Sequence, residues 1–360
     1  MNTYIYRIRL GRVVRSVVAI GCCVACLMMV SCKHGRQRHK ALVFYNDIVL
    51  PTTPVKDQGS SSLCWVYAML ATIETEHLVQ GDSVNLSADY VARAYIMEQA
   101  ENRFLHGYPT KADNDISTRG VAPMLLSLIA THGLTHQDAY HHPDGANMDV
   151  LVRKVQQVVD GEQSEARMRQ RVSALLDESL GPLPRQVFML GARYTPLEFA
   201  HSVCADNEYV ALTSFTHHPY YQRFALELPD NRYHCQFLNV PLDTLIARVE
   251  QSLRHGHPVC WEGDISERYF RWNEGYAVLH NDTATVTAAH RQRSFEHHLT
   301  TDDHCMEIIG LAHDDNNQRY FILKNSWGTS NRYGGYMYMS LSYARLKTIA
   351  IIGPQAPQGL

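Results

Sequence analysis

The sequence predicts an α+β fold, with a helical first half and a second half made mostly of short strands. A mostly apolar stretch without Gly or Pro covers residues 63–79, and further helical stretches follow as far as about residue 160. Short apolar runs bounded by turn residues follow from about residue 209, and no internal repeat or low-complexity segment interrupts them. Helices followed by strands are typical of the α+β class.

The predicted elements follow in chain order. Four helices are expected in the first half, with Ser87 as the N-cap of the second and Gly133 ending the third: residues 63–79, 87–99, 121–132 and 148–159. Strands are expected in the second half at residues 209–215, 224–228, 258–261, 305–312, 320–323, 335–340 and 348–352. One amphipathic helix, residues 242–255, stands among them.

Composition excludes several classes of protein. The 360 residues are 45% hydrophobic and 19% charged, which is typical of a globular chain with a sizeable core. The formal net charge of −3 gives no electrostatic reason to bind nucleic acid.

The first 31 residues are predicted to be a signal peptide. They carry four arginines and no acid, and the apolar run at residues 16–30 is too short for a transmembrane helix. The run ends in Met-Val-Ser-Cys, which resembles a bacterial lipobox, so Cys32 is the expected lipid attachment site, with a basic tether over residues 32–50. The protein is then exported and anchored to a bacterial membrane, on the periplasmic or cell-surface side. The alternative is an ordinary cleaved signal followed by an unmodified Cys32.

Five cysteines remain in the folded part, at positions 64, 204, 235, 260 and 305. An odd number cannot all pair within one chain, and their spacing fits neither a metal knuckle nor a CxxC redox pair. Three pairs of adjacent histidines, at 141–142, 217–218 and 297–298, are interpreted as surface loops, and no metal site is predicted.

The segment Gln58-Gly-Ser-Ser-Ser-Leu-Cys64 delivers a cysteine to the start of a predicted buried helix. A helix N-terminus favours thiolate over thiol, and Gln58 can fold back as a second oxyanion donor beside the N–H of Cys64. For an isolated cysteine, the plainer interpretation is a buried structural residue.

Two residues further along supply the partners of Cys64. His304 precedes one predicted strand, and Asn325 follows the next, so adjacent strands place them close together. The Asn carbonyl can then accept from one imidazole nitrogen while the other faces the thiol. Asp302 and Asp303 precede the histidine, either to tune its pKa or as a solvated turn.

Five motifs follow one another along the chain: Gln58, Cys64-Trp65, Leu86-Ser87, His304 and Asn325-Ser-Trp-Gly328. The same order is found in papain-like cysteine peptidases, which the sequence resembles. The middle of the chain is similar to the bleomycin hydrolase and aminopeptidase C branch. The resemblance implies a papain-like domain over residues 51–352, with a helical half at about 55–190, a β-barrel-like half at about 195–352 and the cleft between them. Residues 353–360 form a tail.

By resemblance, Cys64 is the nucleophile, His304 the general acid/base, Asn325 its orienting partner and Gln58 the oxyanion donor. Gly120, Trp65 and Trp327 are expected among the substrate-binding residues. This sequence departs from the family pattern where glycines or small residues are usual, at Arg119, Ser62 and Cys305.

The expected activity is peptide hydrolysis through an acyl-thioester without a cofactor, with an aminopeptidase favoured. The alternatives are a papain-like endopeptidase, a non-catalytic peptide-binding protein and an acyl-transfer enzyme on the same residues. The resembled branch forms hexamers and uses a C-terminal arm to hold the substrate's amino group, so a homo-oligomer and a role for residues 353–360 are expected by resemblance.

Overall fold

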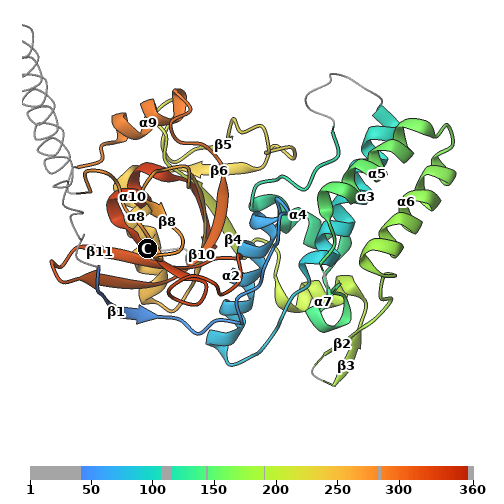
Figure 1. Ribbon diagram of the computed structural model, residues 1–360, viewed down its shortest axis with the longest axis horizontal. Coiled ribbons are helices and arrows are strands. Elements are labelled where there is room, and N and C mark those ends of the chain that lie inside the picture. Colours follow the sequence, from blue (N-terminus) through green and yellow to red (C-terminus); the bar gives the residue numbers. More distant parts are fainter. Residues whose placement is uncertain (1–41, 107–114, 143–144, 190, 283–284, 356–360) are drawn as a thin grey trace, which may run out of the picture. The chain divides into compact units, whose positions relative to one another are not determined.

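The computed structural model describes residues 42–106, 115–142, 145–189, 191–282 and 285–355 (Figure 1). The chain divides into two units, Met1–Val43 and Phe44–Leu360, and every described helix and strand belongs to the second. The predicted signal peptide and Cys32 lie outside the described residues. Within the described part, no helix combines the length and apolar character that a membrane crossing requires.

The helical half is built around α3, which packs against α4, α5 and α6. A short hairpin, β2–β3, leads into α7, and α7 packs on α4. Its elements are α2 (Cys64–Gln80), α3 (Ala88–His106), α4 (Pro123–His132), η1 (Gln137–Ala139), α5 (Met148–Gly161), α6 (Glu165–Leu180), β2 (Val187–Met189), β3 (Ala192–Tyr194) and α7 (Pro196–Val203).

The second half is one twisted sheet with the strand order β5-β6-β4-β13-β7-β10-β11-β12-β9-β8, and β1 pairs with β10 off this path. Its strands are β1 (Phe44–Val49), β4 (Tyr209–Thr213), β5 (Arg223–Ala225), β6 (Gln236–Asn239), β7 (Val259–Gly263), β8 (Phe270–Arg271), β9 (Tyr276–Ala277), β10 (His304–Asp314), β11 (Arg319–Lys324), β12 (Tyr336–Ser340) and β13 (Thr348–Pro354). The helices of this half are α8 (Leu242–Arg254), α9 (Ala288–Glu296) and α10 (Leu341–Lys347).

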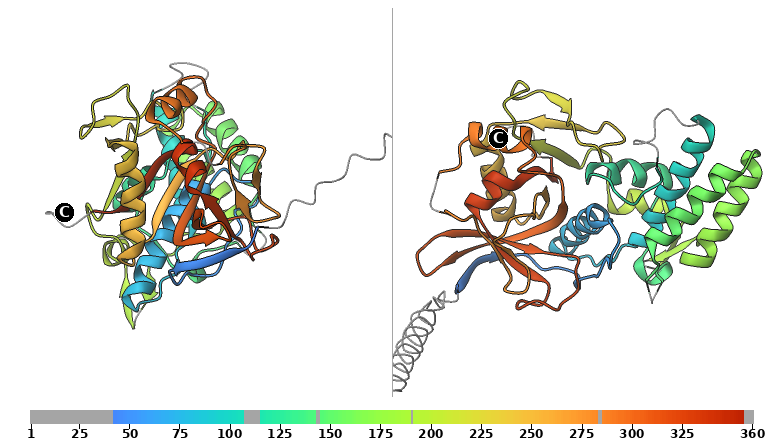
Figure 2. Two further views of the ribbon diagram at one scale, coloured as in Figure 1. Left: turned by 90° about the vertical axis from the view of Figure 1, so that its left-hand side faces the viewer. Right: turned by 45° about the horizontal axis from the view of Figure 1, so that its top comes forward.

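Helix α2 lies between the sheet and the other helices, in contact with β10 and β7 on one side and with α3 and α4 on the other (Figures 1 and 2). This position explains why the sequence of α2 is apolar almost all round. The helix ends at Gly81, whose φ of 93° is a left-handed conformation that favours glycine. Its first residue, Cys64, is thereby placed at the boundary between the two halves.

The four predicted helices of the first half and the seven predicted strands are all present, with ends that differ by a few residues. Ser87 caps α3 by accepting from the N–H of Tyr90, and Gly133 follows the last residue of α4. The amphipathic helix of the second half is α8. The α+β prediction is confirmed.

Three predicted boundaries differ from the structure. Residues 44–49 are strand β1 and pair with the end of β10, so only the part before them can serve as a tether. The helical half extends past residue 195, because α7 packs on α4. Residues 353–354 still belong to strand β13, and residues 356–360 of the predicted tail lie outside the described residues.

A buried ionic network joins α2 to the sheet behind the site. Glu74 accepts hydrogen bonds from Lys56 Nζ and from the N–H of Leu86, both at 2.6 Å, and from the hydroxyl of Thr53. Lys324 Nζ in turn donates to Thr53 at 3.0 Å. Glu74 is fully buried, so these donors are what stabilises its charge inside the protein.

Candidate active site

Cys64 lies half-buried at the start of α2 and lines a pocket of about 280 Å³. Backbone donors in the first helical turn have no intrahelical acceptor, and the helix dipole there favours a negative charge. The pKa of the Cys64 thiol is well below its ordinary value, first because Cys305 donates a hydrogen bond to it, and then because of the hydrogen bond and charge of His304. Burial opposes this shift without reversing it.

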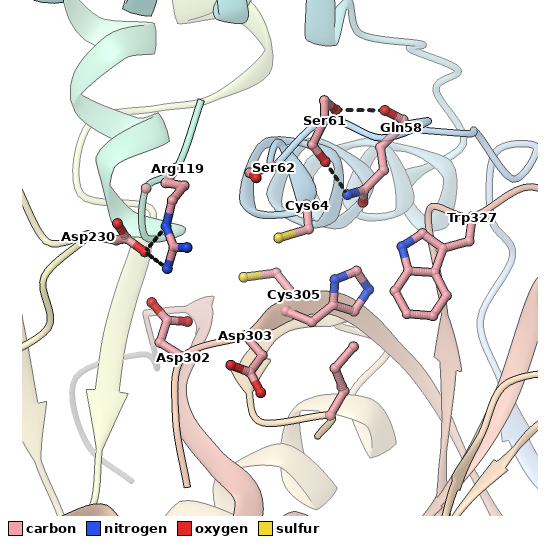
Figure 3. A pocket seen from close by; sticks show the side chains of 13 residues that line it. Gln58, Ser61, Ser62, Cys64, Arg119, Asp230, Asp302, Asp303, Cys305 and Trp327 are labelled. Carbon is pink, nitrogen blue, oxygen red and sulfur yellow. Dashed lines mark hydrogen bonds and ion pairs between the residues drawn. The ribbon is translucent and has the colours of Figure 1, made fainter. Parts of the chain in front are cut away.

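Cys305 is the next residue after His304 on β10, and its sulfur points toward that of Cys64 (Figure 3). Burial and the negative charge of Cys64 raise the pKa of the Cys305 thiol well above its ordinary value. Cys305 therefore keeps its proton and serves as a hydrogen-bond donor to the thiolate. From the sequence, this residue was only a departure from the family pattern.

His304 and Asn325 lie together because β10 and β11 are antiparallel neighbours, with one residue at the start of β10 and the other just after β11. His304 Nε2 is 2.7 Å from Asn325 Oδ1, and both residues are buried. Asn325 Oδ1 also accepts from the N–H of Ser326 at 2.7 Å, which fixes the orientation of the amide. Since an amide oxygen only accepts, Nε2 carries a proton and Nδ1 is left for Cys64.

Trp327 covers the imidazole. Its ring centroid lies 4.6 Å from that of His304, with an angle of 35° between the planes, and the edge of Trp272 packs against it at 5.3 Å. Trp327 also lines the pocket, as expected of a residue that both shields the histidine and touches a ligand.

Gln58 lines the same pocket and is held in one orientation. Its Oε1 accepts from the Ser326 hydroxyl at 2.6 Å, and its Nε2 donates to the carbonyl of Ser61 at 2.7 Å. The amide nitrogen has a second hydrogen that this contact leaves free. Gln58 thus presents a fixed N–H donor beside Cys64.

The expectation for Trp65 is wrong, whereas Gly120 does line the pocket. Trp65 is fully buried, and its Nε1 donates to the carbonyl of Thr118 at 2.9 Å, so its ring is part of the core. A Cβ at Gly120 would lie 2.8 Å from the Trp65 ring, so this ring explains why glycine is required there. The residue after a helical nucleophile points about 100° away from it around the helix axis.

Two of the residues that depart from the family pattern, Arg119 and Ser62, form part of the pocket wall. Arg119 reaches across from the helical half and pairs with Asp230, which precedes β6 in the other half, through Nη2 at 2.7 Å and Nε at 2.8 Å (Figure 3). Ser62 is exposed and also lines the pocket. The arginine therefore closes one end of the pocket with an ion pair between the halves.

The sequence did not point to Glu262, and it left the role of Asp302 open. Asp302 lines the pocket, and Glu262 lies fully buried on β7, directly across from Cys305. Burial, followed by the negative charge of Asp302, raises the pKa of Glu262 well above its ordinary value. Burial, with the charges of Cys64 and Asp230, raises the pKa of Asp302 to about 7. A single carboxylate inside the apolar run 258–263 was the available signal for Glu262.

The pair His217–His218 lies in a surface loop, as expected, and both side chains point at Glu227, with Nε2 to carboxylate distances of 3.2 and 2.7 Å. Gln292 orients His217: its Oε1 accepts from the N–H of Thr216, so its amide nitrogen faces His217 Nδ1 at 3.0 Å. His217 Nε2 therefore carries the proton donated to Glu227, which is the wrong tautomer for binding a metal through Nε2.

Brief alkylation at mildly acidic pH is expected to label Cys64 before the other described cysteines. Burial raises the pKa of Cys204 to about 12 and that of Cys235 to about 11, so both stay thiols, whereas Cys64 is a thiolate. Peptide mapping after iodoacetamide treatment at pH 6 measures the order. Cys305→Ala should slow the labelling of Cys64, and Cys204→Ala should leave it unchanged. Equal labelling of all the cysteines would contradict an activated nucleophile.

Comparisons with known proteins agree with this arrangement. Residues 187–351 match the model of the Peptidase C1-like family. The chain is 24% identical to aminopeptidase W of Lactobacillus delbrueckii subsp. lactis, over 84% of this chain and 81% of that protein. It is 22% identical to the mitochondrial cysteine proteinase 1 of Saccharomyces cerevisiae, over 85% and 76%. The crystal structure of PepW from Lactobacillus rhamnosis has the same fold, with a TM-score of 0.65 over 87% of this chain and 83% of that one, at 18% identity.

The fold and these relationships define a papain-like cysteine peptidase. Within that class, residues 187–351 match the Peptidase C1-like family, and the chain is similar to aminopeptidases. The family resemblance predicted from the sequence is confirmed.

Proposed function

We propose that this protein is a cysteine aminopeptidase, which releases N-terminal residues from peptides by nucleophilic catalysis at Cys64. The observation that carries the proposal is the surroundings of the Cys64 sulfur, with a thiol donor at Cys305 and an imidazole at His304 whose far nitrogen is held by Asn325. A binding module has no need of a thiolate with this support.

The steps follow from the positions of the donors. The Cys64 sulfur attacks the carbonyl carbon, and the resulting oxyanion accepts from the N–H of Cys64 and from Gln58 Nε2. The C–N bond then breaks as His304 gives the leaving amine the proton that its Nδ1 took from the Cys64 thiol, which leaves an acyl-thioester. His304 next takes a proton from water, the hydroxide adds to the thioester, and the acid and the Cys64 thiolate are released.

An N-terminal cut is supported by the relatives that are named aminopeptidases W, E and G. The described part of the C-terminus leads away from the nucleophile. Thr348 pairs with Gly263, which also pairs with His304, whereas Pro354, at the other end of β13, pairs with Tyr209. The groups that recognise a free amino terminus are therefore sought among the residues that line the pocket.

The test compares a free peptide with its N-acetylated twin. We expect the free peptide to be cleaved at least about tenfold faster, as judged by kcat/KM, because acetylation removes a cationic group that a charged partner would bind. Mass spectrometry of the products should show single residues leaving the N-terminus. Equal cleavage of the two peptides would favour the papain-like endopeptidase, and no cleavage of either would favour the peptide-binding alternative.

Acyl transfer is the remaining alternative on the same residues. It would reveal itself as a new peptide bond when an amine acceptor is added, at the expense of the hydrolysed product.

Export and lipid anchoring through Cys32 remain part of the proposal. The support is the sequence of residues 1–32, four arginines and an apolar run that ends in Ser-Cys. We expect Cys32→Ser to move the protein from the membrane fraction to the soluble fraction, as measured by fractionation and metabolic labelling with a fatty acid. A mature N-terminus other than a modified Cys32 would contradict the anchor.

Assembly into a homo-oligomer, a hexamer in the resembled branch, also remains a prediction. Size-exclusion chromatography with light scattering measures it directly.

A further inference from the structure

A group of carboxyls lies on one side of Cys64, and the imidazole lies on the other. Figure 3 shows Trp327 on one side of the Cys64 sulfur and Asp302 and Asp230 on the opposite side. The leaving amine must lie where His304 can protonate it, which is the side covered by Trp327. The residue that supplies the acyl group therefore extends toward Asp302.

Glu262 lies behind this side of the pocket. It is fully buried and is not among the residues that line the pocket, and its Oε2 accepts from the N–H of Ala122 at 3.2 Å. Its position across from Cys305 places it on the face of the sheet that carries the thiol beside Cys64. Burial raises the pKa of Glu262 well above its ordinary value, and its carboxyl is hydrogen-bonded to Asp302, so it supports Asp302 from behind.

Arg119 and His304 are the basic side chains among the residues that line the pocket. Arg119 is paired with Asp230, and His304 contacts Asn325 and Cys64. Burial and the charges of Cys64 and Asp230 raise the pKa of Asp302 more than the charge of Arg119 lowers it, so a charge on Asp302 is only partly compensated in the free protein.

We propose that Asp302, backed by Glu262, binds the free α-ammonium group of the peptide substrate and so restricts cleavage to the N-terminal residue. This inference rests on the proposed aminopeptidase function. An ammonium has three donors, and the two carboxylate oxygens of Asp302 offer acceptors for two of them, while Glu262 supports Asp302 from behind. An N-acetyl group carries no charge and would bury Asp302 without a counterion.

The reach of the substrate favours the main-chain amine over a basic side chain. The α-nitrogen is two bonds from the carbonyl carbon that Cys64 attacks, so a group that binds it must lie beside the sulfur. Both Asp302 and Glu262 are close enough to Cys64 for its charge to affect their pKa values. A lysine or arginine side chain needs space several bonds further away.

The pH dependence supports the same assignment. With its pKa at about 7, Asp302 loses its negative charge below neutrality, so the KM for a free-amine substrate should rise as the pH falls through 7. The groups that face Asp302 come from every element around it: Glu262 from β7, Cys64 from α2, Asp230 from the segment before β6 and Arg119 from the segment before α4. The shift of the Asp302 pKa is upward first because of burial and then because of the charges of Cys64 and Asp230, which the hydrogen bond from Glu262 and the charge of Arg119 offset only in part.

The experiment measures kcat/KM for a free aminoacyl coumarylamide and for its N-acetyl twin. In Asp302→Asn, we expect the preference for the free substrate to fall roughly 10- to 100-fold, chiefly through a higher KM for the free substrate, while the acetylated substrate is cleaved at least as well as by the wild type. In this variant, the rise in KM as the pH falls through 7 should disappear. The matched control is Asp138→Asn, the same change at a side chain that is 87% exposed on η1.

Folding of the variant is checked by thermal unfolding. The folded-state pKa of Asp302 lies above its unfolded value, so its ionisation destabilises the protein as the pH rises from about 4 through 7. Asp302→Asn should therefore melt no lower than the wild type at pH 8.

The outcomes separate this inference from the proposed function. If the wild type prefers free amines and Asp302→Asn keeps that preference, the α-ammonium assignment is wrong and the aminopeptidase stands. If the wild type cleaves acetylated peptides equally well, the aminopeptidase itself fails. The alternative is that Asp302 binds a basic side chain of the substrate. It is tested with a third set of substrates, acetylated dipeptidyl coumarylamides that carry Arg or Leu in the first position. A preference for Arg that is lost in Asp302→Asn would assign the carboxyl to a basic side chain and overturn the inference.

Discussion

Replacing Cys64 with alanine should lower kcat/KM by at least about 10⁴-fold, because no other group near His304 can form the acyl intermediate. Cys305 does not substitute for it, since burial keeps that neighbouring thiol protonated. The measurement is the hydrolysis of a free aminoacyl coumarylamide, with circular dichroism to show that the fold is unchanged. Cys64 is only half-buried, so its truncation leaves a small cavity.

The double variant Cys64→Ala/His304→Ala separates catalysis from general damage. Residues that act as one unit are strongly non-additive, so the double variant should be no slower than Cys64→Ala alone. Cys204→Ala, another free cysteine whose thiol stays protonated, serves as the control and should retain wild-type activity. Hydrolysis that survives in Cys64→Ala would end the peptidase assignment for this site.

The second large effect concerns stability. Glu74→Ala should reduce the free energy of unfolding by about 3–5 kcal/mol, because it leaves the partly buried Lys56 without its carboxylate partner. The N–H of Leu86 loses its acceptor as well. Urea denaturation followed by tryptophan fluorescence measures the loss.

Two further variants make this test specific. Glu178→Ala, the same change at an exposed position on α6, should alter the unfolding free energy by no more than about 0.5 kcal/mol. The double change Lys56→Met/Glu74→Met should be tolerated better than Glu74→Ala, because apolar residues can replace a buried ion pair. A loss below about 1 kcal/mol in Glu74→Ala would show that the network is not needed.

The strands and the helices of the first half could be predicted because they are short apolar runs or long apolar stretches that local pattern reveals. Helix α6 was missed, since it buries only one narrow stripe, Met168, Val172, Leu176 and Leu180, among many charges. Strand β1 was missed because most of its side chains are exposed and two polar residues, Asn46 and Asp47, interrupt its apolar ones.

The nucleophile and its two partners could be predicted because each lies at the end of a recognisable element. The acids on the other side of the pocket could not, since Glu262 and Asp302 meet only through strand pairing between β7 and β10. The role of Cys305 was hidden in the same way, as only the structure shows its sulfur facing Cys64. Trp65 was assigned wrongly because sequence adjacency to a helical nucleophile does not give the direction of a side chain.

The separation of Cys64 from His304 and Asn325 along the chain has a consequence for the order of synthesis. The ribosome makes α2 early, but β10 and β11 come near the end, and His304 reaches the sulfur only after β10 has paired with β7. Until then, Cys64 is an ordinary thiol without a base or a hydrogen-bond donor at its side. A growing chain is therefore inert toward its neighbours, and hydrolysis begins only once β10 and β11 have been made and β10 has closed on α2.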